Sequence, residues 1–211
     1  MDNTWATPLF FRPFEHGVDI SIHSATKYIA GHSDALMGVV IAGERPLEER
    51  VRTAWAELGQ TAGPDECYLA LRGLRTLDVR LRRHYDSALR VAEWLASRPE
   101  VERVLYPALE SSPGHALWRR DFLGASGLFG VEFGPCPARA VANMVDKLQL
   151  FGIGASWGGC ESLVLPVHPS NHRPGTARTG PILRMHVGLE HPQDLIDDLE
   201  RGLHRLRETP P

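Results

Sequence analysis

The amino-acid sequence predicts an α/β fold, in which short apolar strands alternate with amphipathic helices. Three observations carry this prediction. Residues 36–42 form a short apolar run, LMGVVIA, of the kind that buried strands show. From Pro64 onward, apolar side chains recur every three or four positions, as they do along one face of a helix. Strand-like and helix-like segments then alternate to the end of the chain, which fits either an α/β or an α+β arrangement.

The composition permits a sizeable core and disfavours two classes of partner. Of the 211 residues, 43% are hydrophobic and 23% are charged, close to the average of globular proteins. The net charge is −3 and no basic stripe stands out, so nucleic-acid binding has little support. No apolar run approaches the roughly 20 residues that a membrane-spanning helix needs.

The cysteines and the first residues favour a cytoplasmic location. Cys67, Cys136 and Cys160 are odd in number and widely spaced, so they suggest no disulfide framework. The N-terminus does not show the basic stretch and apolar stretch of a signal peptide. Both features fit a reducing compartment.

The first sixty residues contain two expected strands and one expected helix. Residues 18–22 alternate apolar and polar side chains like a short strand. Residues 36–42 are expected to form a buried strand. Pro46 suits the first turn of a helix that runs to about Leu58, and residues 59–63 follow as a loop.

The strongest periodic signal predicts one long helix between Pro64 and Pro99. Asp65 and Glu66 lie in its first turn, where carboxylates are favoured, and Pro99 ends it. We expect this helix to join two domains. Its apolar stripe comprises Cys67, Ala70, Leu71, Leu74, Leu77, Leu81, Tyr85, Ala88, Ala92 and Leu95.

The second half contains three expected strands, two expected helices and one long loop. The strands are residues 101–105, 128–133 and 182–187, and the helices are residues 137–148 and 192–207. The buried face of the last helix is expected from Leu195, Ile196, Leu199, Leu203 and Leu206. Residues 166–181 are rich in Pro, Gly, Ser and Thr, which predicts a loop.

A lysine flanked by hydroxyl groups is the first candidate for chemistry. Ser24 and Thr26 are two residues apart, so their hydroxyls lie on one side of an extended segment, where they can bind a phosphate. Lys27 follows, and a desolvated lysine can form a Schiff base with a carbonyl compound. From spacing alone, a solvated loop lysine is the commoner interpretation.

Three other segments offer polar groups. Asp2 can pair with a protonated ring nitrogen, or it can cap a turn. The segment Ser156-Trp157-Gly158-Gly159 has two glycines that let the backbone approach a ligand closely, although on its own a loop with one packed tryptophan is the commoner interpretation. Arg184 stands inside an apolar strand, where it either clamps a carboxylate or forms an internal salt bridge.

Taken together, these segments resemble the pyridoxal-phosphate (PLP) enzymes of cysteine and methionine metabolism. The resemblance extends along the whole chain, and SATKY followed by GHSD is its most specific part, being similar to that family's cofactor-lysine signature. Asp2 and Lys27 are 25 residues apart, as in the family. The segments that carry the resemblance are DNTWATP, SIHSATKYIAGHSDALMG, PDECYLALRGLRTLDVRL, SWGGCESL and ILRMHVGLEHPQDLIDDL.

The resemblance implies a fold of the aspartate-aminotransferase type (fold type I). Residues 1–73 would then be the C-terminal part of the large PLP-binding domain, and residues 74–211 the small C-terminal domain. It also implies the roles of the site residues: Lys27 attaches the cofactor covalently, Asp2 pairs with its ring nitrogen, Ser24 and Thr26 contact its phosphate, and Arg184, Ser156 and Trp157 bind the substrate.

Two tryptophans place the resemblance in the cystathionine β-lyase branch. Relatives that act at the γ-carbon usually carry Leu at the position of Trp157 and Phe at that of Trp5. The implied reaction is β-elimination of cystathionine, or of other cysteine S-conjugates, to a thiol, pyruvate and ammonia, with homocysteine as the thiol from cystathionine. The alternatives are a γ-acting relative (cystathionine γ-synthase or γ-lyase) and an inactive truncated remnant.

The resemblance also suggests that part of a typical member is absent. The sequence begins inside the expected strand that delivers Asp2, and roughly the first half of the family pattern has no counterpart. That half would hold the glycine-containing phosphate loop, the aromatic residue that stacks on the ring, and a tyrosine and an arginine lent by a neighbouring subunit. We therefore expect a homo-oligomer, a dimer or tetramer, when complete, and poor activity from residues 1–211 alone.

A metal site is not expected. His168 and His172 are four residues apart, but they lie in the expected loop and not on one helix face. No acidic or cysteine ligand accompanies them closely, as a metal site would require.

Overall fold

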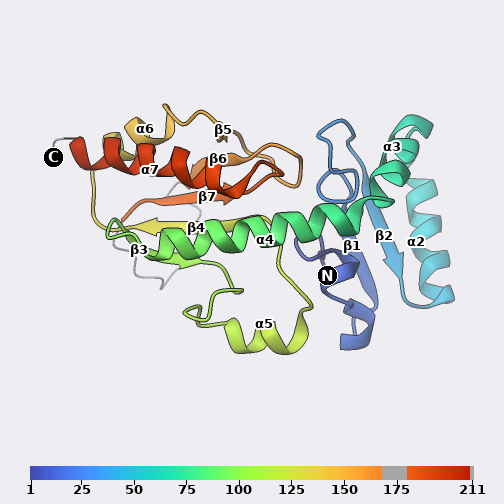
Figure 1. Ribbon diagram of the computed structural model, residues 1–211. Helices are drawn as coiled ribbons and strands as arrows, with labels where there is room; N and C mark the ends of the chain where they lie inside the picture. Colours follow the sequence, from blue (N-terminus) through green and yellow to red (C-terminus); the bar gives the residue numbers. More distant parts are fainter. Residues whose placement is uncertain (168–179, 210–211) are drawn as a thin grey trace.

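The computed structural model describes residues 1–167 and 180–209, and its α/β character agrees with the prediction. The segments up to residue 74 gather at one end of the molecule around a two-stranded sheet (Figure 1). The later segments form a five-stranded sheet with its helices, and helix α4 runs from one part into the other (Figure 1). The domain boundary between residues 73 and 74 stays a prediction.

The first part contains a small antiparallel sheet. Strand β1 pairs with strand β2, with Ile22 opposite Val40. The prediction places Asp2 in a continuous strand, but it forms only an isolated parallel bridge to Ile22, and the chain turns at Thr4. The elements are α1 (Thr7–Phe10), a 3-10 helix (Pro13–His16), β1 (Ile20–Ser24), β2 (Gly38–Ala42), α2 (Arg45–Glu57) and α3 (Pro64–Leu74).

The second part is a mixed sheet in the order β3-β4-β7-β6-β5, in which only the β5–β6 pair is parallel. Its strands share one hydrophobic core with α4, α6 and α7, centred on fully buried side chains such as Val131, Leu183 and Leu199. The elements are α4 (Leu77–Ala96), β3 (Val101–Leu105), α5 (His115–Asp121), β4 (Leu128–Phe133), α6 (Ala138–Val145), β5 (Gly152–Ile153), β6 (Leu163–Val167), β7 (Ile182–His186) and α7 (Pro192–Glu208).

The prediction of one long helix after Pro64 was wrong, because the chain breaks into α3 and α4 at Arg75 and Thr76. The backbone N–H and the hydroxyl of Thr76 both donate to the Gly73 carbonyl, at 3.0 and 3.1 Å. Arg80 Nη2 donates to the same carbonyl at 2.8 Å. The Gly73 carbonyl therefore accepts these bonds in place of the usual i to i+4 helical bond. The apolar side chains still recur every three or four positions across the break, so the sequence does not reveal it.

The prediction that residues 36–42 form a buried strand was also wrong. Strand β2 begins at Gly38, and Leu36, Val40 and Ile41 are 85%, 49% and 37% exposed. Its only strand partner among the described residues is β1, and although helix α2 contacts β2, these three side chains stay exposed.

Five elements were not predicted from the sequence, and one of them overlaps a predicted loop. The four shortest or most irregular are α1, the 3-10 helix, α5 and β5, which have two to seven residues each. The fifth is strand β6, whose last two residues, Pro166 and Val167, lie in the predicted loop 166–181. Residues 168–179 of that loop lie outside the described residues, as do His168 and His172.

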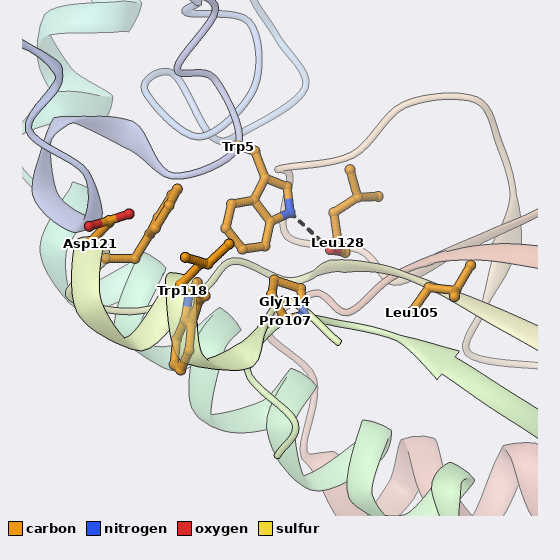
Figure 2. A pocket seen from close by; sticks show the side chains of 9 residues that line it. Trp5, Leu105, Pro107, Gly114, Trp118, Asp121 and Leu128 are labelled. Atoms are coloured by element: carbon orange, nitrogen blue, oxygen red, sulfur yellow. Dashed lines mark hydrogen bonds between the residues drawn. The ribbon is translucent and has the colours of Figure 1, made fainter. Parts of the chain in front are cut away.

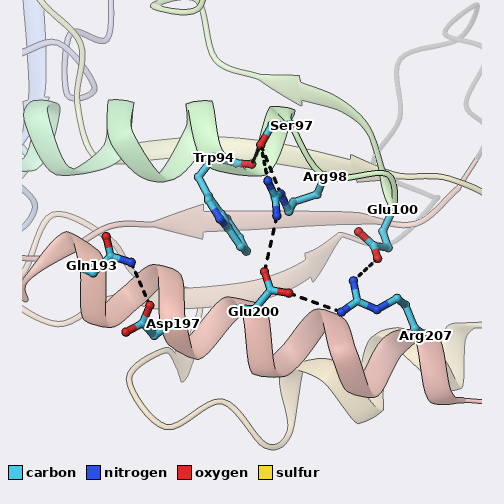
Figure 3. Close-up of polar contacts among 8 residues, drawn as sticks. All are labelled: Trp94, Ser97, Arg98, Glu100, Gln193, Asp197, Glu200 and Arg207. Atoms are coloured by element: carbon cyan, nitrogen blue, oxygen red, sulfur yellow. Dashed lines mark hydrogen bonds and ion pairs between the residues drawn. The ribbon is translucent and has the colours of Figure 1, made fainter.

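Polar contacts tie helix α7 to the end of α4 (Figure 3). The Glu200 carboxylate lies 3.8 Å from Arg98 Nη1 and 3.5 Å from Arg207 Nη2. Arg207 Nη1 also donates to Glu100 Oε1 at 2.6 Å. Because the Glu100 side chain is only 9% exposed, this pair keeps the last helix close to the start of β3.

Substitution of Gly73 by alanine is expected to lower the free energy of unfolding by about 1–3 kcal/mol, as overpacking does. The added Cβ would clash with the backbone carbonyl oxygens of Ile29 and Ala30, which follow Lys27. Because the obstacle is backbone and not a flexible side chain, the upper end of this range applies, which outweighs the gain of about 1 kcal/mol in helix propensity. Urea denaturation measures the change. Gly134→Ala is the control, because its Cβ would meet nothing nearer than 3.9 Å, and an equal loss in both variants would contradict the packing argument.

Candidate active site

Lys27 lies on a tight turn directly after β1. Its backbone N–H donates to the Ser24 carbonyl at 3.0 Å, and its carbonyl accepts from Gly31 N at 2.8 Å. Arg80, which is 6% exposed, reaches under the turn and donates to the Tyr28 and Ile29 carbonyls at 2.8 and 3.3 Å. A buried arginine thus fixes the backbone that presents Lys27, a role that sequence patterns do not reveal.

The Lys27 amine meets two predicted substrate residues that are about 130 positions away in the chain. Nζ donates to Ser156 Oγ at 3.1 Å and lies 5.5 Å from the centre of the Trp157 ring. Partial burial lowers the pKa of Lys27, and the positive charge of Arg184 lowers it further. A lysine with a lowered pKa is more often unprotonated near neutral pH, which makes it a better nucleophile and base.

Gly158 and Gly159 are expected to let the backbone approach a ligand, but in the structure they let it approach another part of the chain. Gly158 has a φ of +88°, and a Cβ there would lie 2.9 Å from Lys27 C and 3.0 Å from Tyr28 N. A Cβ on Gly159 would lie 2.5 Å from Ser33 Oγ. The glycines therefore let loop 156–159 pack directly on the Lys27 turn.

The three other predicted cofactor residues line one hollow of about 390 Å³. The Asp2 carboxylate accepts from Thr4 N at 2.8 Å, and hydrogen bonds from the Thr4 side chain and backbone lower its pKa, so it is ionised. The Ser24 hydroxyl has no hydrogen-bond partner among the described residues. Thr26 Oγ1 is engaged, since it accepts from Met37 N at 2.9 Å.

His23 also lines this hollow and is 2% exposed. Its Nε2 lies 3.0 Å from Ser21 Oγ, while Nδ1 is buried without a partner in the part of the chain that the structure describes. Burial lowers the pKa of His23, and the Asp2 carboxylate opposes that effect in part. A polar ligand in the hollow would find an ionised carboxylate, a free hydroxyl and a neutral imidazole in its wall.

Arg184 lies in β7 as predicted, and its Nη2 donates to the Ala155 carbonyl at 2.6 Å. The Gly154 and Ser156 carbonyls are each 3.5 Å from the same nitrogen. Within residues 1–167 and 180–209 no carboxylate pairs with Arg184, so the internal salt bridge is not found. In that part of the chain its Nε and Nη1 make no hydrogen bond, which leaves them for a ligand beside Ser156.

Trp5 links the first part of the molecule to the second (Figure 2). Its indole N–H donates to the Leu128 carbonyl at 2.9 Å. The ring lies in an apolar hollow of about 440 Å³, with Phe122 packed edge-on at 6.1 Å between ring centres. The residue thus contributes packing between the parts, and Trp157 is the tryptophan that lies beside Lys27.

Two kinds of feature are absent from the described residues. No group of three or more His, Cys, Asp or Glu side chains in that part of the chain is arranged to hold a metal ion. No helix there is long and apolar enough to cross a membrane.

Comparison with curated proteins gives close relatives along nearly the whole chain. The chain is 52% identical over 207 residues to a Rhizobium johnstonii protein named "Putative cystathionine beta-lyase", covering 96% of the chain and 52% of that protein. It is 44% identical to the L-alanine/L-glutamate racemase of Wolbachia pipientis (97% and 52% covered) and 45% identical to the cystathionine beta-lyase MetC of Escherichia coli (98% and 53% covered). The chain spans about half the length of these relatives.

A solved structure and a family model agree with this result. The cystathionine gamma synthase of Xanthomonas oryzae pv. oryzae, solved in complex with cystathionine, superposes with a TM-score of 0.91 at 37% identity, covering 99% of this chain and 56% of that one. The family model described as Cys/Met metabolism PLP-dependent enzyme matches residues 1–204. The chain therefore belongs to the PLP-dependent enzymes of cysteine and methionine metabolism.

Proposed function

We propose that the chain supplies the cofactor lysine and the substrate-carboxylate site of a PLP-dependent carbon–sulfur β-lyase. The observation that carries the proposal is the meeting of Lys27 with Ser156 at 3.1 Å, next to the loop that Arg184 holds. Lys27 contacts the Ser156 hydroxyl and Arg184 lies near the Ser156 carbonyl. An amine and a carboxylate-binding arginine around one residue suit an α-amino acid, whose amine and carboxylate are attached to one carbon.

The residues present fit the cofactor. Asp2, Ser24 and Thr26 share the hollow of about 390 Å³, and Lys27 directly follows Thr26. We propose that the ionised Asp2 pairs with the ring nitrogen, that Ser24 and Thr26 contact the phosphate, and that Lys27 makes the covalent link. When bound, PLP supplies an electron sink for the charge left at Cα after proton loss.

Lys27 has a second role once its amine is free. Partial burial and Arg184 lower the pKa of Lys27, and a shift in this direction favours the unprotonated amine that a general base requires. Ser156 Oγ holds the amine by a hydrogen bond, and the Trp157 ring lies beside it and limits the approach of water. We assign to Lys27 the removal of the Cα proton that precedes loss of the thiolate from Cβ.

Arg184 and Ser156 orient the substrate. The Nη2 of Arg184 is bonded to the loop, which leaves Nη1 and Nε to bind the substrate carboxylate in a fork. Such a clamp fixes the Cα–H bond relative to Lys27, and alignment of this kind is worth about 7–11 kcal/mol of barrier in favourable cases.

Product analysis tests the proposed reaction. With cystathionine, the full-length gene product carrying PLP is expected to release pyruvate and homocysteine, because Trp157 and the named relatives favour the β-lyase branch. A dominant yield of 2-oxobutyrate and cysteine would favour the γ-acting alternative, which the cystathionine gamma synthase structure supports. Racemisation of alanine without pyruvate would favour the activity named for the Wolbachia relative. Failure to bind PLP would favour an inactive remnant.

Three further proposals concern the whole protein. We propose a homo-oligomer, supported by the exposed apolar side chains of β2. We propose a cytoplasmic location, supported by three cysteines that form no disulfide. We also propose that the cofactor part ends near residue 73, supported by the break between α3 and α4.

A further inference from the structure

Strand β7 holds loop 156–159 at two points. Arg184 and His186 are two residues apart, so their side chains lie on the same face of the strand. Arg184 donates to the Ala155 carbonyl, and His186 Nε2 accepts from Gly158 N at 3.1 Å. The second contact is buried, because His186 is 1% exposed.

The hydrogen bond to Gly158 decides where the His186 proton lies. A backbone N–H only donates, so Nε2 must offer its lone pair, and a neutral His186 then carries its proton on Nδ1. That Nδ1 is buried and has no hydrogen-bond partner among the described residues.

His84, on helix α4, has the complementary arrangement. Its Nδ1 lies 2.8 Å from the Val187 carbonyl, which only accepts, so the proton of a neutral His84 is on Nδ1 and Nε2 has a lone pair. That Nε2 is likewise buried without a partner in the described part of the chain. The two rings lie 5.2 Å apart between centres, and since no direct hydrogen bond joins the two nitrogens, one bridging water would connect them.

The opposite tautomer of His186 satisfies fewer groups. A proton on Nε2 would donate to the Gly159 carbonyl at 3.2 Å, but it would point toward the Gly158 N–H. The Gly158 donor would then be buried and unpaired, and two lone pairs would face each other between the histidines, which is costly.

We propose that His186 and His84 form a neutral hydrogen-bond relay from helix α4 to Gly158, which positions Ser156 and Trp157 against Lys27. The donors all run in one direction: Gly158 N–H to His186 Nε2, His186 Nδ1–H through one bridging water to His84 Nε2, and His84 Nδ1–H to Val187 O. His186 is thus a positioning residue, and its effect on substrate binding rests on the proposed role of Ser156 and Arg184.

The charge state of both rings agrees with the relay. Burial lowers the pKa of His186 to about 3 and that of His84 to about 4. The cationic groups near them, Arg184 and Lys27 at His186 and Arg80 at His84, lower these pKa values further. Both imidazoles are therefore neutral at neutral pH, as two successive lone-pair acceptors require.

Replacement of His186 by leucine or glutamine tests the relay in the PLP-loaded, full-length gene product. In His186→Leu, no acceptor remains, so amide exchange in residues 157–160 is expected to become about tenfold faster, the effect of losing one buried hydrogen bond. KM for the amino-acid substrate should rise about tenfold by the same reasoning, with kcat less affected. His186→Gln places an acceptor at the reach of Nε2 and should recover most of both losses.

The exchange measurement does not depend on the reaction, so it remains informative if the parent releases no pyruvate. The relay would be overturned if amide exchange in residues 157–160 of His186→Leu were as slow as in the parent. It would also be overturned if His186→Leu and His186→Gln showed equally fast exchange and an equally raised KM. Exchange in helix α7 is the control for global unfolding. If His186→Leu does not fold, His84→Asn replaces it: the amide still reaches Val187 O but removes the Nε2 acceptor. Unchanged exchange at Gly158 in that variant would also overturn the relay.

Discussion

Replacement of Lys27 by alanine is expected to abolish covalent cofactor attachment and to lower kcat by at least about 10²–10⁴-fold, the usual contribution of a general base. The chain has only two lysines, Lys27 and Lys147. Lys147 is exposed, in the turn after α6, whereas the Lys27 amine contacts Ser156 and the Trp157 ring. No other lysine of this chain can therefore replace it.

Borohydride reduction followed by digestion identifies the attachment site. The phosphopyridoxyl group is expected on the peptide that contains Lys27. Lys147→Ala is the matched control and should leave both the modified peptide and the turnover unchanged. Modification of Lys147 in the parent, or retained covalent PLP in the variant Lys27→Ala, would refute the assignment.

Sequence motifs located the candidate site because its chemistry depends on residue types at short spacing. SATKY identified Lys27 together with Ser24 and Thr26, and the structure presents them on one turn and one hollow wall. A lone charge within an apolar run singled out Arg184, and its strand lies where that run predicted. Periodicity likewise predicted α7, whose buried leucines are those of the expected stripe.

The remaining features depend on contacts between distant segments, which periodicity does not contain. The apolar stripe of α3 continues into α4, so only the bonds from Thr76 and Arg80 to the Gly73 carbonyl reveal the break. The burial of β2 depends on covering elements, and a short apolar run says nothing of whether they are present. The histidine relay joins α4, loop 156–159 and the end of β7, which are far apart in the sequence.

Substitution of Arg184 by alanine is expected to weaken substrate binding through loss of the carboxylate clamp. Removing one partner of a buried charged pair costs about 2–5 kcal/mol. Because Arg184 is only partly buried, the low end applies, and KM should rise about thirtyfold, the equivalent of 2 kcal/mol. The cofactor absorbance should persist, since Lys27 and the hollow with Asp2 are untouched. Arg184→Lys keeps the charge but loses the fork, so its KM should fall between the two.

A pair of ligands separates the clamp from a general disturbance of loop 156–159, whose carbonyls Arg184 also holds. Alanine and ethylamine both present an amine, but only alanine presents a carboxylate. The parent is expected to bind alanine more tightly than ethylamine, as measured by the absorbance change of the bound cofactor, and Arg184→Ala should lose most of that difference. If the variant weakens both ligands equally, Arg184 acts only by holding the loop, because a carboxylate clamp would affect alanine alone.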